Sequence, residues 1–264
     1  KHKVLLFVNS TWNIYNFRLG LVNFLRSSNY QVVTVAPADK YLSKITSNVC
    51  AFYNIKLDKK GLNILNEMIT FYHFLNILIK EKPNVLLTIT IKPNIYGSIA
   101  AYLLDIPVIN NIAGLGTTFS RNGILKTFIL FLFRFALSSS NKVFFQNSED
   151  KMFFINKNLV DSKVTDILPG SGVNLKTFSY KKPPKKNKIR FLLISRMIYE
   201  KGVEVFVNAC RVLIEQGNNC EFCLLGFIDS SYKGAISEIK INHWVMEGIV
   251  NYLGETTDVR NEIQ

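Results

Sequence analysis

A serine, an arginine, a lysine and a glycine stand close together where two segments of contrasting pattern meet. Ser195 and Arg196 follow an apolar run that is typical of a buried strand, and Lys201 and Gly202 precede a segment with the apolar spacing of a helix. The amino end of a helix favours anions, and two fixed cations beside it strengthen that preference. Alone, an arginine and a lysine five residues apart would indicate only surface charge. Placed after a buried strand, they predict a diphosphate site.

Polar residues and glycines follow three other predicted strands. They are Ser10 and Thr11 after the first strand, Lys92 and Asn94 after the fourth, and Gly114 and Gly116 after the fifth. Ligands of open parallel sheets bind beyond the carboxyl ends of the strands, so these residues are candidate ligand contacts. The Gly114 loop has Phe119 where a dinucleotide fingerprint needs a third glycine, and no P-loop pattern occurs, which disfavours NAD and P-loop chemistry. A plain turn is an equally good interpretation of Gly114 and Gly116.

The sequence does not predict a metal site or a catalytic triad. The three histidines are scattered, and neither an Asp-X-Asp nor a His-Glu-X-X-His pattern occurs. No Ser, His and Asp set can be assembled with any specificity. Cys220 and Cys223 form a CxxC pattern inside an apolar run, where a strand would point the two thiols to opposite faces. We interpret them as buried thiols rather than a zinc or redox pair, which indicates a reduced, cytoplasmic protein.

Length and composition indicate a globular chain with a large core. The chain has 264 residues, of which 48% are hydrophobic and 19% are charged, and this excludes disordered, collagen-like and coiled-coil proteins. The net charge of +13 favours anionic partners, whether nucleic acid, phosphorylated small molecules or a membrane surface. The most hydrophobic stretch, 124–137, contains two cations and would extend only ~21 Å as a helix, too short to span a bilayer.

Short apolar runs alternate with longer segments of helical spacing, which is typical of a parallel sheet built from βαβ units. The predicted strands are 4–8, 31–36, 52–57, 85–90, 108–111, 142–145, 164–168, 189–195, 221–226 and 249–253. The predicted helices are 17–27, 62–81, 94–104, 123–139, 148–156, 202–216 and 232–240, with a last one beginning at Asp258. Within the helix 62–81, an amphipathic face is predicted from the spacing of Leu65, Ile69, Tyr72 and Leu75.

The composition changes abruptly at 181–188, where charge repulsion and paired prolines exclude both helix and sheet. We interpret this segment as a linker between a first domain, 1–180, and a second domain, 189–264. A patch that binds nucleic acid or anionic lipid is the alternative interpretation. The second domain contains about half of the elements of a doubly wound domain, so we expect it to be truncated at its carboxyl end.

Six motifs, which follow one another along the chain, resemble those of bacterial family 4 glycosyltransferases of GT-B fold. They are ValAsnSerThrTrpAsnIleTyrAsnPheArg (8–18), IleLysProAsnIleTyrGlySerIleAlaAla (91–101), ValIleAsnAsnIleAlaGlyLeuGlyThrThrPhe (108–119), ProGlySerGlyValAsnLeuLysThrPhe (169–178), SerArgMetIleTyrGluLysGlyVal (195–203) and TyrLeuGlyGluThrThrAspVal (252–259). The sequence is most similar to the branch that extends undecaprenyl-diphosphate-linked sugars in N-glycan, O-antigen and capsule assembly, which includes N-acetylgalactosaminyltransferases. The likeness runs through essentially the whole chain.

The resemblance implies two Rossmann-like, doubly wound α/β domains with the active site in the cleft between them. The first domain would take the acceptor and the second the nucleotide sugar. Arg196 and Lys201 would be the catalytic cations on the donor diphosphate. The further donor-binding residues would be Ser10, Thr11, Gly114, Gly116, Gly226, Gly254 and Glu255, and the acceptor-binding residues Arg18, Lys92 and Asn94. Many relatives have a histidine where Ile91 and Lys92 stand here, and the Glu-X7-Glu element of the family lies beyond residue 264.

The implied reaction is a retaining, metal-independent transfer of a hexose or N-acetylhexosamine to an undecaprenyl-diphosphate-linked glycan. The donor would be a UDP-sugar, with GDP as the alternative nucleotide, and no cofactor is expected. Breaking the anomeric bond leaves negative charge on the nucleotide diphosphate, which Arg196 and Lys201 would stabilise. Two charge-assisted hydrogen bonds of ~1.5 to 3 kcal/mol each would supply roughly two to four powers of ten in rate. No carboxylate nucleophile is evident, so front-face attack by the acceptor hydroxyl is implied.

A lipid-linked acceptor would also explain the basic charge. We expect a cytoplasmic enzyme, peripheral at the inner face of the plasma membrane, with one helix on the anionic surface. That helix carries Lys126, Phe128, Phe131, Phe133 and Arg134, and a core helix is the equal alternative. The sequence leaves two other functions open. One is a catalytically silent fragment that binds only the membrane or acceptor. The other, nucleic-acid binding, is disfavoured because no RNA-binding aromatic motif or helix-turn-helix pattern occurs.

Overall fold

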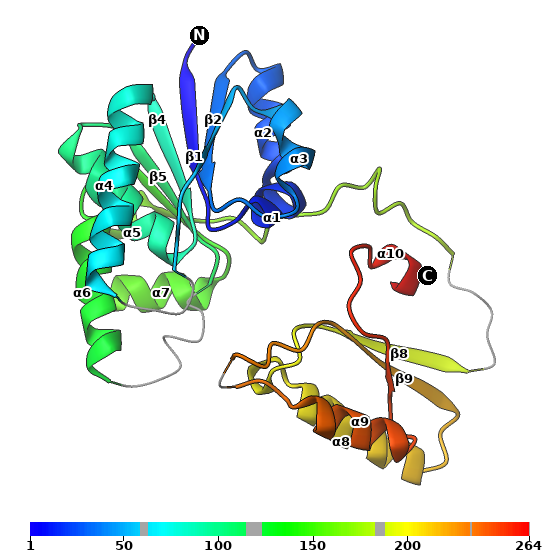
Figure 1. Ribbon diagram of the computed structural model, residues 1–264. Helices are drawn as coiled ribbons and strands as arrows, with labels where there is room; N and C mark the ends of the chain where they lie inside the picture. Colours follow the sequence, from blue (N-terminus) through cyan, green and yellow to red (C-terminus); the bar gives the residue numbers. More distant parts are fainter. Residues whose placement is uncertain (59–62, 115–122, 183–187, 233, 264) are drawn as a thin grey trace. The chain divides into compact units, whose positions relative to one another are not determined.

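The computed structural model of the chain describes residues 1–58, 63–114, 123–182, 188–232 and 234–263. These residues form two compact units, Lys1–Asn174 and Leu175–Gln264, and each unit contains its own parallel sheet (Figure 1). The predicted α/β class with two parallel sheets is therefore confirmed.

The sheet of the first unit has seven parallel strands in the order β3-β2-β1-β4-β5-β6-β7. They are β1 Lys3–Phe7, β2 Gln31–Ala36, β3 Ala51–Asn54, β4 Val85–Ile89, β5 Val108–Ile112, β6 Lys142–Phe145 and β7 Thr165–Ile167. Along β1, Leu5 and Phe7 face one core and Leu6 faces another on the opposite side of the sheet. A strand buried on both faces has a nearly continuous apolar sequence. This burial explains why short apolar runs located the strands well.

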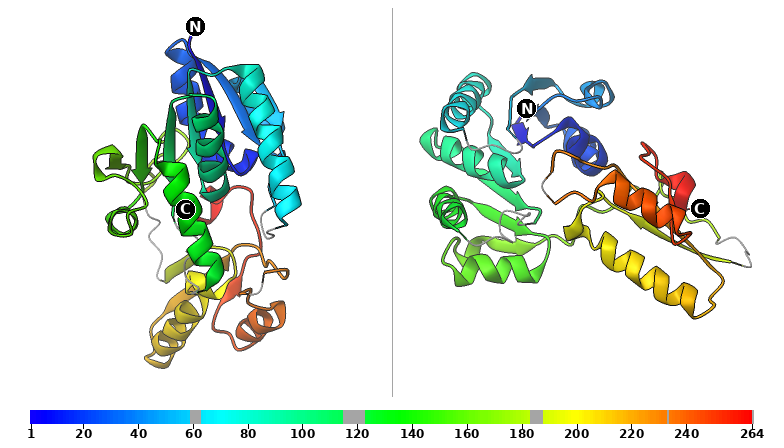
Figure 2. Two further views of the ribbon diagram at one scale, coloured as in Figure 1. Left: turned by 90° about the vertical axis from the view of Figure 1, so that its left-hand side faces the viewer. Right: turned by 60° about the horizontal axis from the view of Figure 1, so that its bottom comes forward.

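Helices cover both faces of this sheet. On one face, α4, α5, α6 and α7 supply core side chains, and α2 and α3 do so on the other. The bounds are α1 Thr11–Asn13, α2 Leu19–Ser27, α3 Leu42–Ile45, α4 Ile64–Glu81, α5 Ile91–Leu103, α6 Ile124–Leu137 and α7 Ser148–Asn156, with a π-helix, Ile14–Arg18, between α1 and α2. The left view of Figure 2 looks onto α4, α5 and α6.

The second unit has a smaller parallel sheet in the order β10-β9-β8. Its elements are β8 Ile189–Ile194, α8 Val203–Glu215, β9 Cys220–Leu225, α9 Glu238–Met246, β10 Asn251–Tyr252 and α10 Arg260–Ile263. Val207 of α8 and Trp244 of α9 pack with Phe222 of β9 in one apolar core. Cys220 and Cys223 are free thiols, and Cys223 is buried. Among the residues that the structure describes, no helix combines the length and apolarity needed to cross a bilayer.

The helix predicted at 232–240 lies later in the structure, as α9, Glu238–Met246. Ser237 caps it, because its Oγ accepts the backbone N–H of Lys240 at 3.2 Å. The preceding residues instead form an isolated antiparallel bridge, in which Ala235 pairs with Ile198 of the connection between β8 and α8. The first predicted helix, 17–27, also begins earlier, at Thr11. Both errors concern helix starts that are set by polar caps rather than by apolar spacing.

The amphipathic face predicted for α4 does not lie in the core. Leu65, Ile69 and Tyr72 are exposed, and only Leu75 of the predicted face packs against the core, where it is partly buried. The fully buried side of the helix consists of Thr70, Phe74, Ile77 and Leu78. Apolar residues surround most of this helix, so two stripes fit the helical spacing equally well. The structure buries one stripe and leaves the other on the surface.

Candidate functional site

The strand order of the first sheet reverses between β1 and β4. From this pair the chain builds outward to β2 and β3 on one side and to β5, β6 and β7 on the other. Ligands of doubly wound sheets bind outside the carboxyl ends of the strands at such a switch point. Ser10 lies in the turn after β1 and Thr11 begins α1, while Thr90 lies in the turn after β4 and Lys92 is in the first turn of α5. The topology therefore brings the predicted residues of both turns to one edge of the sheet.

The hydroxyl groups of Ser10 and Thr11 shape the first of these turns. The Oγ of Ser10 accepts the N–H of Asn13 at 3.1 Å and so caps α1. Thr11 is fully buried, and its Oγ1 accepts the N–H of Asp39 at 3.0 Å. In return, the carboxylate of Asp39 accepts the N–H of Trp12 at 2.8 Å. The two hydroxyls thus fix the backbone of the turn.

Arg18 is a buried cation at the end of the π-helix. Its side chain is only 8% exposed, and its Nε makes no hydrogen bond within the part of the chain that the structure describes. Burial lowers the pKa of Arg18 below its ordinary value, because desolvation disfavours the charged form. A buried donor without a partner is rare in proteins, and it indicates a place for a ligand or water. π-helical turns are frequent at functional sites.

The turn after β4 is strained. Thr90 has φ 79° and ψ 167°, a conformation that a β-branched residue seldom adopts, and its Oγ1 is buried without a hydrogen-bond partner among the described residues. Such strain persists only where the surroundings enforce it, and it clusters at ligand sites. Sequence patterns give no warning of this feature.

Lys92, which follows directly, is held on the surface of the helices. Its Nζ forms an ion pair with Glu67 of α4, and Tyr96 donates its hydroxyl proton to the same carboxylate. Burial first, and then the hydrogen bond to Glu67 and the charge of that carboxylate, raise the pKa of Tyr96 well above its ordinary value. The positive charge of Lys92 is therefore partly compensated where it stands.

Asn94 lies inside the first unit, with no exposed surface. Its Oδ1 accepts the hydroxyl of Thr88 at 2.6 Å, and its Nδ2 donates to the carbonyl oxygen of Asn111 at 3.0 Å. Asn110 donates to Thr88 at 2.7 Å and to Ser98 at 2.7 Å, which extends the buried network. The side chain of Asn94 thus joins α5 to β4 and β5. In this position it supports the turn from within.

Gly114 follows β5 with φ +118°, and nothing lies within 4 Å of the position that a Cβ would take. This backbone conformation favours glycine, and it is compatible both with a plain turn and with a backbone that closely approaches a ligand. Gly116, the other predicted glycine of this loop, lies outside the described residues.

In the second unit, the carboxyl ends of all three strands converge. A Cβ built on Gly226 would lie 1.7 Å from the carbonyl oxygen of Ser195, and the φ of Gly226 is +148°. The N–H of Gly226 donates to the carbonyl oxygen of Gly254 at 2.8 Å. The hydroxyl of Tyr252 donates to the carbonyl oxygen of Gly226 at 2.7 Å. Ser195, Gly226 and Gly254, which follow β8, β9 and β10, are thus locked together.

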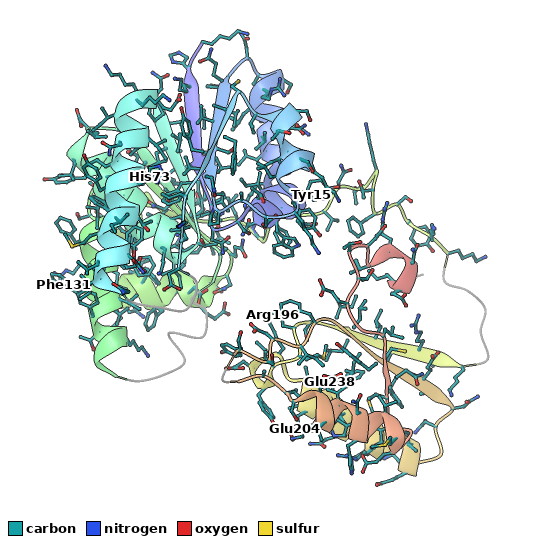
Figure 3. All side chains as sticks on the ribbon, in the orientation of Figure 1. Tyr15, His73, Phe131, Arg196, Glu204 and Glu238 are labelled. Carbon is teal, nitrogen blue, oxygen red and sulfur yellow. The ribbon has the colours of Figure 1, made fainter. Side chains whose placement is uncertain are left out.

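Arg196 projects beside this convergence and is exposed (Figure 3). Its guanidinium lies 5.8 Å from the ring centroid of Tyr232, whose hydroxyl donates to Glu200 at 2.8 Å. Lys201 is also exposed, at the end of the short turn Tyr199–Lys201, and it forms no ion pair within the described residues. Gly202 follows with φ 71° and begins α8. Both predicted cations therefore stand in the β8–α8 connection with their charges available.

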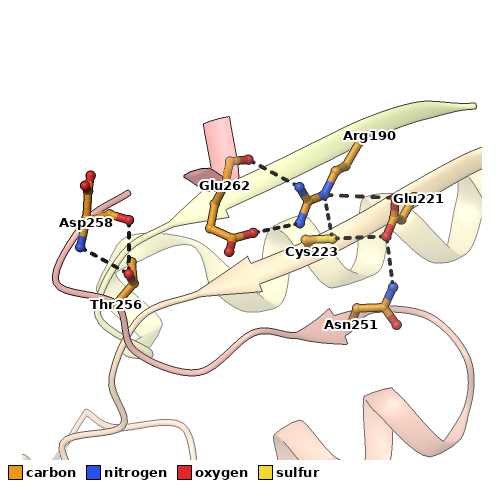
Figure 4. A network of polar contacts seen from close by, with 7 residues as sticks. All are labelled: Arg190, Glu221, Cys223, Asn251, Thr256, Asp258 and Glu262. Atoms are coloured by element: carbon orange, nitrogen blue, oxygen red, sulfur yellow. Dashed lines mark hydrogen bonds and ion pairs between the residues drawn. The ribbon is translucent and has the colours of Figure 1, made fainter. Parts of the chain in front are cut away.

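The segment that carries Gly254 and Glu255 is fixed at its far end too (Figure 4). Arg190 of β8 binds Glu262 of α10, with Nη2 and Oε2 3.2 Å apart, and its Nε donates to the Sγ of Cys223 at 3.2 Å. Glu255 is exposed, and its charge contributes, after burial and Glu238, to the raised pKa of Tyr252. Sequence reasoning missed Arg190, because nothing in its spacing distinguishes it from a surface arginine.

No group of three or more histidine, cysteine, aspartate or glutamate side chains that could hold a metal ion occurs among the described residues. The groups that the structure brings together are cations and backbone amides. This chemistry suits an anionic ligand such as a phosphate.

The fold is that of a GT-B glycosyltransferase, and the chain belongs to the glycosyl transferase 4-like family, whose sequence model matches residues 3–147. It is 24% identical over 269 residues to the Campylobacter jejuni N,N'-diacetylbacillosaminyl-diphospho-undecaprenol alpha-1,3-N-acetylgalactosaminyltransferase, covering 96% of this chain and 69% of that enzyme. It is 24% identical over 227 residues to the capsular polysaccharide biosynthesis glycosyltransferase CapM of Staphylococcus aureus, covering 80% of this chain and 58% of CapM.

Among solved structures, the Anabaena protein HepE in complex with UDP and glucose has the same fold, with a TM-score of 0.74 and 13% identity. The alignment covers 99% of this chain and 72% of HepE. The chain therefore spans between 58% and 72% of these relatives. The predicted family, fold and glycosyltransferase class are confirmed.

Proposed function

We propose that this chain transfers a hexose or N-acetylhexosamine from a UDP-sugar to a glycan that is linked to a lipid diphosphate. Family membership supports the reaction class. The name of the Campylobacter relative supports a lipid diphosphate acceptor, and the bound UDP of HepE supports a uridine nucleotide donor. In this proposal the second unit takes the donor and the first unit takes the acceptor.

The observation that carries the proposal is the convergence at Gly226. A Cβ on Gly226 would meet the carbonyl oxygen of Ser195 at 1.7 Å, so the backbone at the ends of β8 and β9 packs tightly there and fixes the start of the β8–α8 connection. Arg196 and Lys201 place two positive charges on the same connection, at the start of α8. Positive groups fixed beforehand stabilise a developing anion without reorganising. A nucleoside diphosphate fits this combination of a rigid strand-end backbone and two cations on one connection.

The chemistry follows from the same charges. The bond between the anomeric carbon and the diphosphate breaks, and its electron pair stays on the phosphate oxygen beside Arg196 and Lys201. The acceptor hydroxyl forms the new bond to the anomeric carbon, and its proton passes to the departing phosphate. We propose attack from the face that the leaving group occupied, which retains the anomeric configuration. Glu255 and Gly254 would border the nucleotide base.

On the acceptor side, the proposal gives Arg18 the main polar role. Its buried, unpartnered Nε is suited to a phosphate oxygen of the acceptor diphosphate. Lys92 shares its charge with Glu67, so its contribution would be smaller. Asn94, which is fully buried, would act by supporting the turn rather than by touching the acceptor.

Saturation-transfer NMR with UDP tests the donor site directly. We expect UDP to bind the chain, and the Arg196→Ala Lys201→Ala variant to bind it about 30 to 150 times more weakly, because each of the two lost charge-assisted hydrogen bonds costs roughly 1 to 1.5 kcal/mol at an exposed site. The Arg211→Ala variant is the matched control, since Arg211 is a partly exposed cation of α8 that pairs with Glu247. Equal UDP binding by all three proteins would refute the donor site.

We further propose that the first unit rests on the inner face of the plasma membrane. Phe128 and Phe131 of α6 and Leu65, Met68 and Ile69 of α4 are exposed apolar residues on two helices that flank α5. Arg134 is exposed and basic on α6, which suits anionic lipid. Phe133, which the sequence placed with this group, is fully buried in the core and takes no part.

Flotation with vesicles of anionic phospholipid tests the membrane contact. We expect a Leu65→Asp Phe131→Asp variant to lose at least about nine tenths of its vesicle binding, because each burial of a large apolar side chain contributes ~1.5 to 3 kcal/mol. Phe24→Asp is the matched control, since Phe24 of α2 and Phe131 are both 66% exposed but lie over opposite faces of the sheet. An equal loss with Phe24→Asp would show that the effect is not specific to α4 and α6.

A further inference from the structure

Two large aromatic side chains lie exposed beside the switch point of the first sheet. Trp12 is 45% exposed and Phe17 is 42% exposed, and their ring centroids are 5.2 Å apart at an interplanar angle of 79°. Water around such rings is unfavourable, so a paired and exposed arrangement is costly unless a ligand covers it. Trp12 directly follows the turn residues Ser10 and Thr11.

Hydrogen bonds hold the backbone at Trp12 in place. The N–H of Trp12 donates to Asp39 Oδ2 at 2.8 Å, and its carbonyl oxygen accepts Asn16 Nδ2 at 3.0 Å. Asp39 Oδ1 also accepts the N–H of Tyr41 at 2.8 Å, which fixes the carboxylate itself. A surface fixed in advance loses little conformational entropy when a ligand binds. Within the described residues, no hydrogen bond is made by the indole Nε1 of Trp12, so this donor is available to a ligand.

The same short segment contains buried polar atoms without partners. Asn13 Oδ1 and Arg18 Nε are both buried and make no hydrogen bond within the described part of the chain. Asn13 uses only its Nδ2, which donates to Asn9 Oδ1 at 3.1 Å. Unsatisfied buried groups next to exposed aromatic rings call for a ligand that has both apolar and strongly polar parts.

We infer that Trp12 and Phe17 form the stacking surface for the pyranose ring that receives the new sugar. This inference rests on the proposed function and specifies its acceptor as a pyranose carried on a diphosphate. The C–H groups of one pyranose face form an apolar patch that packs on an aromatic ring, while hydroxyl groups at the rim can accept from the indole N–H. The diphosphate of this acceptor would supply a negatively charged partner for Arg18, whose Nε makes no hydrogen bond within the described residues.

Tryptophan fluorescence can test this, because the chain has only two tryptophans and Trp244 is buried in the second unit. The probe is a water-soluble N-acetylglucosaminyl diphosphate with a short alkyl chain, compared with the same alkyl diphosphate without sugar. We expect a saturable change in emission with the sugar compound only. The change should persist in Trp244→Phe and vanish in Trp12→Phe.

Affinity supplies the second readout. By calorimetry, Trp12→Ala and Phe17→Ala should each bind the sugar compound about tenfold more weakly, and Phe24→Ala should bind it normally. An equal response to the sugar-free compound would overturn the inference in favour of contact with lipid. No response to the sugar compound in a chain that still binds UDP would overturn it while leaving the proposed donor site intact. Loss of UDP binding alone, with the Trp12 response retained, would count against the proposed function instead.

Discussion

Replacing Gly226 by alanine is expected to destabilise the second unit by more than ~3 kcal/mol, because two costs add at one atom. The new Cβ would lie 1.7 Å from the carbonyl oxygen of Ser195, a backbone atom that no side-chain rotation can move aside. The φ of +148° is also one that residues with a side chain rarely adopt. To accept the methyl group, β8 and β9 would have to separate at their carboxyl ends.

Urea unfolding followed by Trp244 fluorescence, in a Trp12→Phe background, measures this effect. Trp244 packs in the apolar core of the second unit, so its emission reports that unit. Gly20→Ala is the control, since Gly20 lies in α2 with nothing within 4 Å of its Cβ position. That change should leave the protein unaffected or stabilise it by up to ~1 kcal/mol. An unchanged midpoint for Gly226→Ala would contradict the close approach of Ser195 and Gly226.

The same substitution bears on function. If the backbone around Gly226 is part of the donor site, the folded fraction of Gly226→Ala should bind UDP more weakly than Arg211→Ala does. Separation of the strand ends would also move Arg196. The preceding residue, Ser195, donates its N–H to the carbonyl oxygen of Leu225 in β9 at 3.0 Å, so a shift of β9 is passed on to it. Stability and donor binding are thus coupled through one glycine.

The position of Arg196 and Lys201 in the β8–α8 connection could be predicted because the sequence signal is local. Arg196 and Lys201 stand between a buried strand and an amphipathic helix, and both elements have clear apolar patterns. A strand that is buried on both faces and a helix with one buried stripe leave little choice for the loop that joins them. The position of that loop at the strand ends then follows from the parallel topology.

The features of the first unit that were not predicted depend on distant contacts. The helical spacing of α4 fits two stripes, and the contact of Phe74 and Ile77 with the sheet decides between them. The strain of Thr90 exists only because β4 and α5 are both fixed by their packing. The role of Asn94 likewise depends on Thr88, Asn110 and Asn111, which are brought together by strand pairing. None of these is visible in a window of neighbouring residues.

Asn94→Ala is expected to destabilise the first unit by about 2 to 4 kcal/mol, because it removes one partner from several buried polar groups at once. Thr88 would lose the acceptor at 2.6 Å, and the carbonyl oxygen of Asn111 would lose the donor at 3.0 Å. Neither group could turn to water, since Asn94 itself has no exposed surface. Hydrogen exchange measured by mass spectrometry should show faster exchange in β4, β5 and the start of α5.

Asn156→Ala provides the matched control, because Asn156 is an exposed residue at the end of α7 and its loss should cost less than ~0.5 kcal/mol. The comparison separates two roles for Asn94. If Asn94 touches the acceptor, its replacement would lower acceptor affinity and leave hydrogen exchange unchanged. If Asn94 instead holds the turn after β4, its replacement would speed hydrogen exchange, and acceptor binding would weaken only as a consequence. The burial of Asn94 predicts the second result, and unchanged exchange with selectively weaker acceptor binding would restore the direct role implied by the family resemblance.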